Sequence, residues 1–450
     1  MALNEAQREY LKTFVAKYAA RSPGSRERRE RAWPHLADPR SSIGFSQHAP
    51  AAVRELWLAT KGLRYPIVAG RCQGEKVWDI DGNQYVDYGL GFGVNLFGHN
   101  PEFIQRALHE RIALGSPMGF QSECANEVAA GICALTGAER VAFCNTGTEA
   151  VMGAIRVARA MTGRAKIVVF AESYHGSHDD VVGAIGATHG ISPAHAAECL
   201  VLQYGTEESL QAIAQHSDQI AAVLVEPVQA RRPDLQPAEY LHRLRALTHE
   251  RRILLVFDDV LLGFRIHPGG CQAHFDIRAD LATYGKVIGG GMPIGVLTGK
   301  SEYMDCIDGG VWRHEDESYP VRDKIWFAGT FNKNPLTMAT TRAVVDRLRE
   351  AGSGLQDSLN RMAEQFATRL GQWLTENGMP VSIARFGSMF RFKSSPELTL
   401  LIQHLHLRGI FTWEGMVFFL STAHTERHLD ELEQAVKDSL LTMRRGGYIQ

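Results

Sequence analysis

The sequence predicts an α/β protein with a mostly parallel β-sheet covered by helices and a smaller α+β domain beside it. The chain has 450 residues, enough to bury the core of one large and one smaller domain. Between residues 100 and 335, compact apolar segments alternate with helical segments, which is typical of parallel strands connected by helices. After Pro335 a long helical stretch, shorter strand-like segments and a closing helix indicate a separate α+β domain.

These patterns divide the chain into four segments. The expected segments are an N-terminal helical segment (1–64), the N-terminal part of the small domain (65–100), the large ligand-binding domain (101–335) and the C-terminal small domain (336–450). Residues 21–40 open with a Ser-Pro-Gly-Ser turn and continue with interleaved arginines and glutamates, which predicts a charged, solvated helix. A docking surface for a partner protein is the alternative interpretation of that helix.

The strands and helices are expected in this order. Residues 65–88 are short apolar stretches broken by glycines and by an Asp-Gly-Asn turn, which predicts a small antiparallel meander. Compact apolar runs predict five strands of the large domain, over residues 140–144, 166–170, 221–225, 253–258 and 294–298. The tail predicts a long helix over 336–377, strand-like segments near 381–393 and 410–420, and a closing helix over 425–444.

Composition and charge exclude several classes of protein. The formal net charge is -2 and charged residues make up 22% of the chain, so no excess charge is available for nucleic acid. The first residues lack a secretory signal, and no apolar run approaches the ~20 residues that cross a bilayer, so no membrane partner is expected and the expected location is cytoplasmic.

The cysteines and histidines do not predict a metal site. The seven cysteines include no C-x-x-C pair and the histidines no H-E-x-x-H motif, which argues against both a disulfide framework and a metal centre. We interpret His404, His406 and His314, which has Glu315 beside it, as solvated or packed side chains. Four glycines between residues 89 and 98 do not fit G-x-G-x-x-G, which disfavours a Rossmann dinucleotide site and leaves a close ligand approach or a structural turn.

The first segment that could bind a ligand or take part in chemistry is residues 145–150. It follows a predicted strand and opens a helix, which places Gly147 and Thr148 at the helix amino terminus. Free N–H groups, the helix dipole and a hydroxyl together form a phosphate site there. An ordinary threonine cap is the alternative.

The second segment is the buried strand over residues 253–258, whose carboxyl end delivers Asp258 and Asp259 to the edge where ligands bind in α/β sheets. A carboxylate in that position needs a cation, and a protonated pyridine nitrogen is one such partner. A metal-binding acid pair and a helix cap are the alternatives.

The third segment, residues 284–291, carries Lys286 between an apolar stretch and three glycines. Desolvation and a neighbouring cationic ring would lower the pKa of the lysine and give the neutral amine that Schiff-base formation needs. A surface lysine on a glycine turn is the alternative.

In order and spacing these three segments resemble the class III aminotransferases of pyridoxal-5′-phosphate (PLP) fold type I, particularly the glutamate-1-semialdehyde aminomutase branch. The resemblance extends from Tyr65 to the end of the chain. It implies PLP as cofactor and a large PLP-binding domain with a seven-stranded type of sheet. It makes Lys286 the Schiff-base lysine and Asp258 the partner of the pyridine nitrogen, with Gly147 and Thr148 as phosphate ligands.

The resemblance also implies roles for five further residues. Tyr174 would stack on one face of the cofactor ring and Val260 on the other. His175 and Glu226 match residues near the cofactor. Thr330 matches a threonine that reaches the phosphate of the neighbouring subunit, which implies a homodimer with shared sites.

A narrower resemblance appears in residues 229–237 and 91–101, which look like the aminotransferase domains of polyketide and nonribosomal peptide synthases. Such domains aminate the β-carbon of a β-ketoacyl chain held on an acyl carrier protein. Gln229-Ala230-Arg231 replaces the Ala-Gly-Asn of the aminomutase, which puts isomerisation of glutamate semialdehyde in doubt. Asp259 replaces a glutamate and is expected to alter reach near the ring.

The expected function is therefore transamination from an amino acid donor to a carrier-bound β-ketoacyl thioester. Arg231 or Arg232 could hold a donor carboxylate or the carrier's phosphopantetheine, with solvated arginines as the alternative. The alternatives for the whole protein are an aminomutase or transaminase acting on a small free keto or aldehyde substrate, and a non-catalytic PLP-fold binding module.

Overall fold

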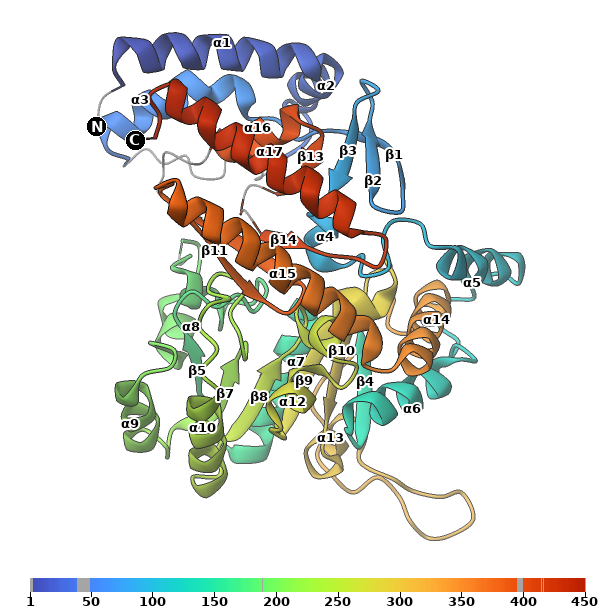
Figure 1. Ribbon diagram of the computed structural model, residues 1–450. Coiled ribbons are helices and arrows are strands. Elements are labelled where there is room, and N and C mark those ends of the chain that lie inside the picture. Colours follow the sequence, from blue (N-terminus) through green and yellow to red (C-terminus); the bar gives the residue numbers. More distant parts are fainter. Residues whose placement is uncertain are drawn as a thin grey trace.

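A computed structural model describes residues 3–38, 49–187, 189–394, 400–413, 415 and 417–449 (Figure 1). Its largest sheet has seven strands in the order β4-β10-β9-β8-β7-β5-β6. In chain order these are β4 (Arg140–Cys144), β5 (Lys166–Phe170), β6 (Cys199–Leu202), β7 (Ile220–Val225), β8 (Leu254–Asp258), β9 (Leu281–Gly285) and β10 (Gly295–Gly299). Only β10 runs antiparallel to its neighbours, so the mostly parallel sheet is confirmed.

Helices cover both faces of this sheet. In β8, Leu255 and Phe257 join the core cluster on one face, whereas Leu254 and Val256 join the cluster on the other. Helix α10 (Ala238–Glu250) contributes to the first cluster and α7 (Gly147–Thr162) to the second. Burial on both faces is why the central strands have nearly continuous apolar sequences, and why those strands could be predicted.

The five predicted strands of the large domain are present within one residue at each end, but β6 and β9 were not predicted. Strand β6 has only four residues, too few for a clear pattern. In β9 the polar Thr283 and the terminal Gly285 interrupt the apolar run. Thr283 is nevertheless fully buried, and its hydroxyl donates a hydrogen bond to Asp258.

Two smaller sheets lie above the large one in Figure 1. One has four strands, β1 (Ala69–Gln73), β2 (Lys76–Asp79), β3 (Gln84–Asp87) and β13 (Ile410–Phe411). The other has three strands, β11 (Val381–Phe386), β12 (Met389–Ser394) and β14 (Val417–Phe419). The antiparallel meander predicted over residues 65–88 is confirmed, and β13 pairs with β3, so distant parts of the chain share one sheet.

The helical stretch predicted over residues 336–377 is present, but it is interrupted. The structure has two helices there, α14 (Pro335–Ala351) and α15 (Gly354–Glu376). Gly352 between them has φ 59° and ψ -153°, a conformation outside the helical region that an L-residue rarely adopts. The predicted closing helix is confirmed as α17 (Glu426–Arg445).

Three helices, α1 (Glu5–Arg21), α2 (Pro23–Ala32) and α3 (Ala51–Thr60), lie at the N-terminal end. The hydroxyl of Tyr10 in α1 is 2.7 Å from His404 Nε2, and that of Tyr18 is 3.0 Å from His406 Nδ1, so both histidines are packed side chains. Helix α2 is the predicted charged helix. Residues 39–40 of that predicted segment lie outside the described residues, and the docking interpretation stays a prediction.

The remaining helices are α4 (Leu90–Gly93), α5 (Glu102–Ala113), α6 (Ala125–Thr136), α8 (Pro193–Glu198), α9 (Glu207–Gln215), α11 (Gly263–Ile266), α12 (Gly270–Phe275), α13 (Ser301–Asp308) and α16 (Leu401–Leu407). Within the described residues no helix is long and apolar enough to cross a membrane. The same part of the chain holds no group of three His, Cys, Asp or Glu side chains arranged around a possible metal ion.

Candidate active site

A cavity of about 420 Å³ brings together the three segments singled out in the sequence. Eight of the eleven expected site residues line it, namely Gly147, Thr148, Tyr174, His175, Glu226, Asp258, Val260 and Lys286. Thr330, Arg231 and Arg232 do not line it, although Ala230 does. The cavity lies where β4, β7, β8 and β9 end, so side chains far apart in sequence meet at one edge of the sheet.

The amino terminus of α7 forms one wall. Thr146, not Thr148, is its cap, because Thr146 Oγ1 accepts the Glu149 N–H at 3.1 Å. Glu149 in turn accepts the N–H groups of Asn145 and Thr146, at 2.6 and 3.0 Å. The N–H groups of the first helical residues, Gly147 and Thr148, have no acceptor within the helix by its geometry, so they are available to an anion.

Glycines allow the neighbouring segments to pack closely at this wall. A Cβ atom on Gly147 would lie 2.9 Å from Val260 Cγ1, and one on Gly176 would lie 2.3 Å from Thr148 Oγ1. Gly176 also has φ +88°, where L-residues are strained. The loop after β5 can therefore lie directly against α7, where the N–H of Ser177 donates to Thr148 Oγ1 at 3.2 Å.

Asp258 is buried at the end of β8 and held from three sides. Its Oδ2 is 2.7 Å from His175 Nδ1. Its Oδ1 accepts hydrogen bonds from the Val260 N–H at 3.2 Å and the Thr283 hydroxyl at 3.3 Å. These contacts fix an acceptor at the cavity wall, as a cationic ring nitrogen requires.

Asp259 points elsewhere, so the expectation that it alters reach near the ring is wrong. It does not line the cavity, and its Oδ2 accepts the Cys271 N–H at 2.8 Å. Successive side chains at a strand end point to opposite sides, which separates the two acids. Burial raises the pKa of Asp259 to about 7. The acid pair is therefore not arranged to share a metal ion.

Lys286 follows β9 directly and lines the cavity, which excludes the surface-lysine alternative. Its φ is 47°, in the left-handed region that non-glycine residues rarely adopt and that often marks functional sites. Burial lowers the pKa of the Lys286 ammonium, while the nearby charges of Asp258 and Glu226 oppose that effect. The environment therefore favours the neutral amine.

A hydrogen bond links the side chain of Glu226 to the backbone of Tyr174. Glu226 Oε2 accepts the Tyr174 N–H at 3.0 Å and so positions the loop that carries Tyr174. Burial raises the pKa of Glu226 to about 7, against the opposing charge of His175. The Nε2 of His175 is buried without a hydrogen-bond partner among the described residues.

The sequence analysis missed other cavity walls. Val94, Met292, Pro293 and Ile294 also line the cavity. Val94 lies in the glycine-rich loop before residue 100, and the other three follow the glycines after Lys286. Their nearness to those glycines was the only available signal, since an apolar side chain has no chemistry that marks it as a wall.

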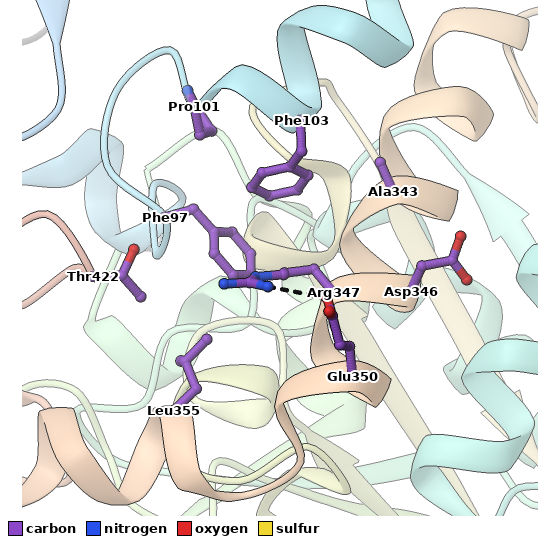
Figure 2. A pocket seen from close by; sticks show the side chains of 9 residues that line it. All are labelled: Phe97, Pro101, Phe103, Ala343, Asp346, Arg347, Glu350, Leu355 and Thr422. Atoms are coloured by element: carbon purple, nitrogen blue, oxygen red, sulfur yellow. Dashed lines mark hydrogen bonds and ion pairs between the residues drawn. The ribbon is translucent and has the colours of Figure 1, made fainter.

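A larger cavity, of about 640 Å³, lies elsewhere, between α5, α14 and the start of α15 (Figure 2). The rings of Phe97 and Phe103 meet edge to face there, with centroids 5.1 Å apart. Its arginine, Arg347, already pairs with Glu350 at 3.0 Å, as the dashed line in Figure 2 shows. This cavity has no lysine in its lining, so its size does not make it the reaction site.

The smaller cavity fits PLP group by group. The helix N–H groups suit its phosphate, Asp258 suits its ring nitrogen and the neutral amine of Lys286 suits its aldehyde. The glycines at 147 and 176 leave room that any side chain would fill. An α/β fold with such a site defines the class of PLP-dependent enzymes.

Comparison with known proteins identifies the family. Residues 58–436 match the family model of the class III aminotransferases, and the chain belongs to this family. It is 34% identical over 403 residues to a glutamate-1-semialdehyde 2,1-aminomutase of Methanosphaera stadtmanae, covering 84% of this chain and 92% of the relative. The enzyme of the same name from Thermomicrobium roseum is 35% identical over 410 residues, covering 85% and 92%.

Solved structures agree with the family. An ω-transaminase from Sphaerobacter thermophilus superposes with a TM-score of 0.82 at 28% identity, covering 95% of this chain and 99% of that one. A β-phenylalanine aminotransferase from Variovorax paradoxus gives 0.81 at 26% identity, covering 98% and 99%. The protein is thus a PLP-dependent class III aminotransferase.

Proposed function

We propose that this aminotransferase moves an amino group between an amino acid donor and a small free keto or aldehyde acceptor, with Lys286 as the covalent attachment point of PLP. The meeting of Lys286, Asp258 and the amino terminus of α7 in one cavity carries the proposal. When bound, PLP supplies an electron sink for the carbon that loses its proton. Aminomutase relatives at 34% and 35% identity support an acceptor of this small, free kind.

Lys286 has two tasks in the proposed reaction. It would hold the cofactor at rest and, once a donor displaces it, its neutral amine would take the proton from the donor's α-carbon. The same amine would then give that proton back, and a water molecule would be consumed as the donor leaves as a keto acid and its amino nitrogen stays with the cofactor. The second half runs in reverse with the acceptor. Burial of the amine supports this role, because a protonated lysine cannot accept a proton.

The other site residues would position the cofactor and polarise its ring. Asp258, held by three partners, would accept the ring N–H and keep that nitrogen protonated. The N–H groups of Gly147 and Thr148 would bind the phosphate. Tyr174 and Val260 would flank the ring as apolar surfaces, and Glu226 holds the Tyr174 loop in place.

A carrier-bound β-ketoacyl thioester is the second candidate acceptor. Residues 229–237 support it, because they differ from the aminomutase pattern and lie beside the cavity through Ala230. Mass spectrometry after incubation with a donor amino acid, a free keto acid or aldehyde and a β-ketoacyl carrier protein compares the two. An aminated free product supports the first candidate, and an aminated carrier supports the second.

We also infer a homodimer, as the resemblance implies. The loop after α13 projects from the body of the molecule in Figure 1 and exposes large apolar side chains at Val311, Tyr319, Val321 and Trp326. Exposed apolar side chains gathered on one segment favour a protein interface. Thr330, at the exposed end of this loop, would then reach the phosphate site of the other subunit.

Borohydride reduction of the PLP-loaded enzyme followed by peptide mapping tests the attachment point. We expect the pyridoxyl label on Lys286. A label on any other lysine contradicts the mechanism. Half-transamination with free amino acids separates an enzyme from a non-catalytic PLP-fold module, because a binding module would leave the donor unchanged.

A further inference from the structure

Strand β12 presents two different faces. Phe390 and Phe392 belong to the main hydrophobic core, so the side chains between them point the opposite way. Met389 on that opposite face packs in a separate cluster with Val228. The face that carries Met389 and Arg391 is therefore directed at the segment that follows β7.

Contacts at every second residue fix β12 against that segment. Met389 shares a cluster with Val228, Arg391 Nη1 donates to the carbonyl oxygen of Arg231 at 3.2 Å, and Lys393 pairs with Asp234. The strand and the segment thus run alongside each other in the same direction. Arg391 and Arg231 are held together by backbone geometry and not by an attraction between their side chains.

Neither arginine has a carboxylate partner among the residues that the structure describes. Within the described ranges, no Asp or Glu oxygen lies within 4.0 Å of Arg391 or Arg231, whereas the neighbouring Lys393 and Arg385 each have one. Burial lowers the pKa of Arg391, the positive charge of Arg231 lowers it further, and Glu172 opposes both. Two like charges, one of them half-buried, are unfavourable together unless an anion joins them.

The pair lies next to the cavity without lining it. Ala230, directly before Arg231, lines the cavity, as does Leu261. Ala230, Leu261 and Val417 all pack against the cluster that holds Val228 and Met389, and Val417 is the β14 partner of Arg391. A substrate with its reacting carbon at Lys286 and a chain longer than the cavity would extend toward the two guanidinium groups.

We propose that Arg391 and Arg231 together bind an anionic group, a carboxylate or a phosphate, on the part of the substrate that projects from the cavity. The inference rests on the proposed function, because it needs the reacting end of the substrate at Lys286. Guanidinium groups suit this task, since each can donate two parallel hydrogen bonds to a carboxylate or a phosphate. A free substrate would supply a second carboxylate, and a carrier-bound substrate the phosphate of its pantetheine arm.

The test uses pairs of probes that differ in one anionic group, as competitive inhibitors of half-transamination by the PLP-loaded enzyme. The pairs are glutarate with its monoamide glutaramate, and pantetheine 4′-phosphate with pantetheine. In the wild type we expect the member with the additional anionic group to bind at least about tenfold tighter in one of the pairs. The pair that shows the preference identifies the source of the anion.

Three variants assign the effect. Arg391→Met should abolish the preference, and Arg231→Met should weaken it while keeping the carbonyl that Arg391 binds. Arg385→Met, in the same sheet but paired with Glu364, is the matched control and should retain the preference. No preference in either pair, or an equal loss in Arg385→Met, overturns the proposal.

The same assay separates this proposal from the proposed function. Each variant is first examined for the visible absorption of bound PLP and for half-transamination at saturating donor. Wild-type enzyme that lacks both refutes the proposed function. Wild-type enzyme that has both, yet does not distinguish the members of either pair, refutes only the anion site.

Discussion

The amine of Lys286 lies in surroundings that favour its neutral form. Burial is the main cause, and the positive charge of the buried Arg265 adds to it. The negative charges of Asp258 and Glu226 act in the opposite direction and raise the pKa of Lys286. Burial raises the pKa of Glu226 to about 7, which limits the negative charge beside Lys286.

Replacement of Lys286 by alanine tests its role as proton acceptor. We expect Lys286→Ala to lower the half-transamination rate by about 10²–10⁴-fold, the usual contribution of a general acid–base group. The measurement is single-turnover loss of the PLP absorption with excess donor. Lys12→Ala, at an exposed lysine of α1, should keep the wild-type rate. A rate for Lys286→Ala within tenfold of wild type would exclude the proposed role.

Asp259 makes a prediction about stability and pH. Its pKa of about 7 is above the ordinary value of 3.8, so the folded state binds this proton more tightly than the unfolded state. The contribution of Asp259 to the free energy of unfolding is therefore present below pH 4 and is lost as the pH rises toward 7. The ionised form then costs between about 1 and 4 kcal/mol.

Asp259→Asn should remove this loss, because asparagine can still accept the Cys271 N–H but carries no charge. We expect urea denaturation to show a smaller fall in the free energy of unfolding between pH 5 and pH 8 in Asp259→Asn than in wild type. Glu208→Gln, at an exposed acid on α9, is the control. Equal pH dependence in wild type and Asp259→Asn would show that Asp259 is ionised in the folded protein throughout.

At the scale of elements, the site depends on a helix start and on the loop pressed against it. The capping box of Thr146 and Glu149 satisfies the N–H groups around the start of α7 and leaves those of Gly147 and Thr148 for a ligand. The loop that carries Tyr174 and His175 reaches α7 only because residue 176 is glycine. On another side, Arg265 donates to the carbonyl oxygens of Leu420 and Gly93, and so fixes the loop of the cavity residue Val94.

Substitution of Gly176 tests this contact. Gly176→Ala places a Cβ 2.3 Å from Thr148 Oγ1, which must push the loop away from the helix. We expect the affinity for PLP, measured by absorbance titration of the apoenzyme, to fall at least about tenfold, since a displaced loop loses its contacts at the phosphate site.

Gly186→Ala is the matched control, because Gly186 also has a positive φ, of +73°, but open space around its missing side chain. Both variants bear a similar backbone strain of about 1 kcal/mol, so their difference isolates the clash. A similar loss of PLP affinity in both variants would mean that strain, and not the contact with Thr148, is responsible.

At the scale of the whole molecule, one exposed surface carries several large apolar side chains. The projecting loop after α13 carries Trp326 with 79% of its surface exposed, although soluble monomers rarely gather such side chains on one segment. Thr330 lies outside the cavity of its own chain. The proposed homodimer would account for both observations.

Trp326→Glu tests the dimer. A buried, unpaired charge at an interface is strongly unfavourable, so we expect the variant to shift from dimer to monomer in sedimentation velocity at micromolar concentration. PLP affinity should fall with it, since the proposed contact of Thr330 with the phosphate site of the other subunit would be lost. Leu58→Glu, at an exposed leucine of α3, should leave the sedimentation unchanged. A wild-type protein that sediments as a monomer would contradict the dimer directly.

The sequence by itself predicted the α/β class, five of the seven strands and the residue types that suit PLP. Asp258 and Lys286 were found because each has a chemical group next to a local pattern, a strand end or a glycine run. Each of these signals is contained within about ten residues, so it can be recognised without knowing how the rest of the chain folds. The break at Gly352 was missed although Gly352-Ser353-Gly354 carries a turn signal, because helical segments continue on both sides of it.

Only the tertiary structure decided which of these residues meet. It placed Lys286 and Asp258 in one cavity with α7, turned Asp259 away from it, and set Arg391 beside Arg231. It also showed that β10 runs antiparallel to β9 and that Thr283 lies within β9. Contacts between distant segments depend on how whole faces pack, and the burial that shifts the pKa values of Lys286 and Glu226 exists only once those faces have closed.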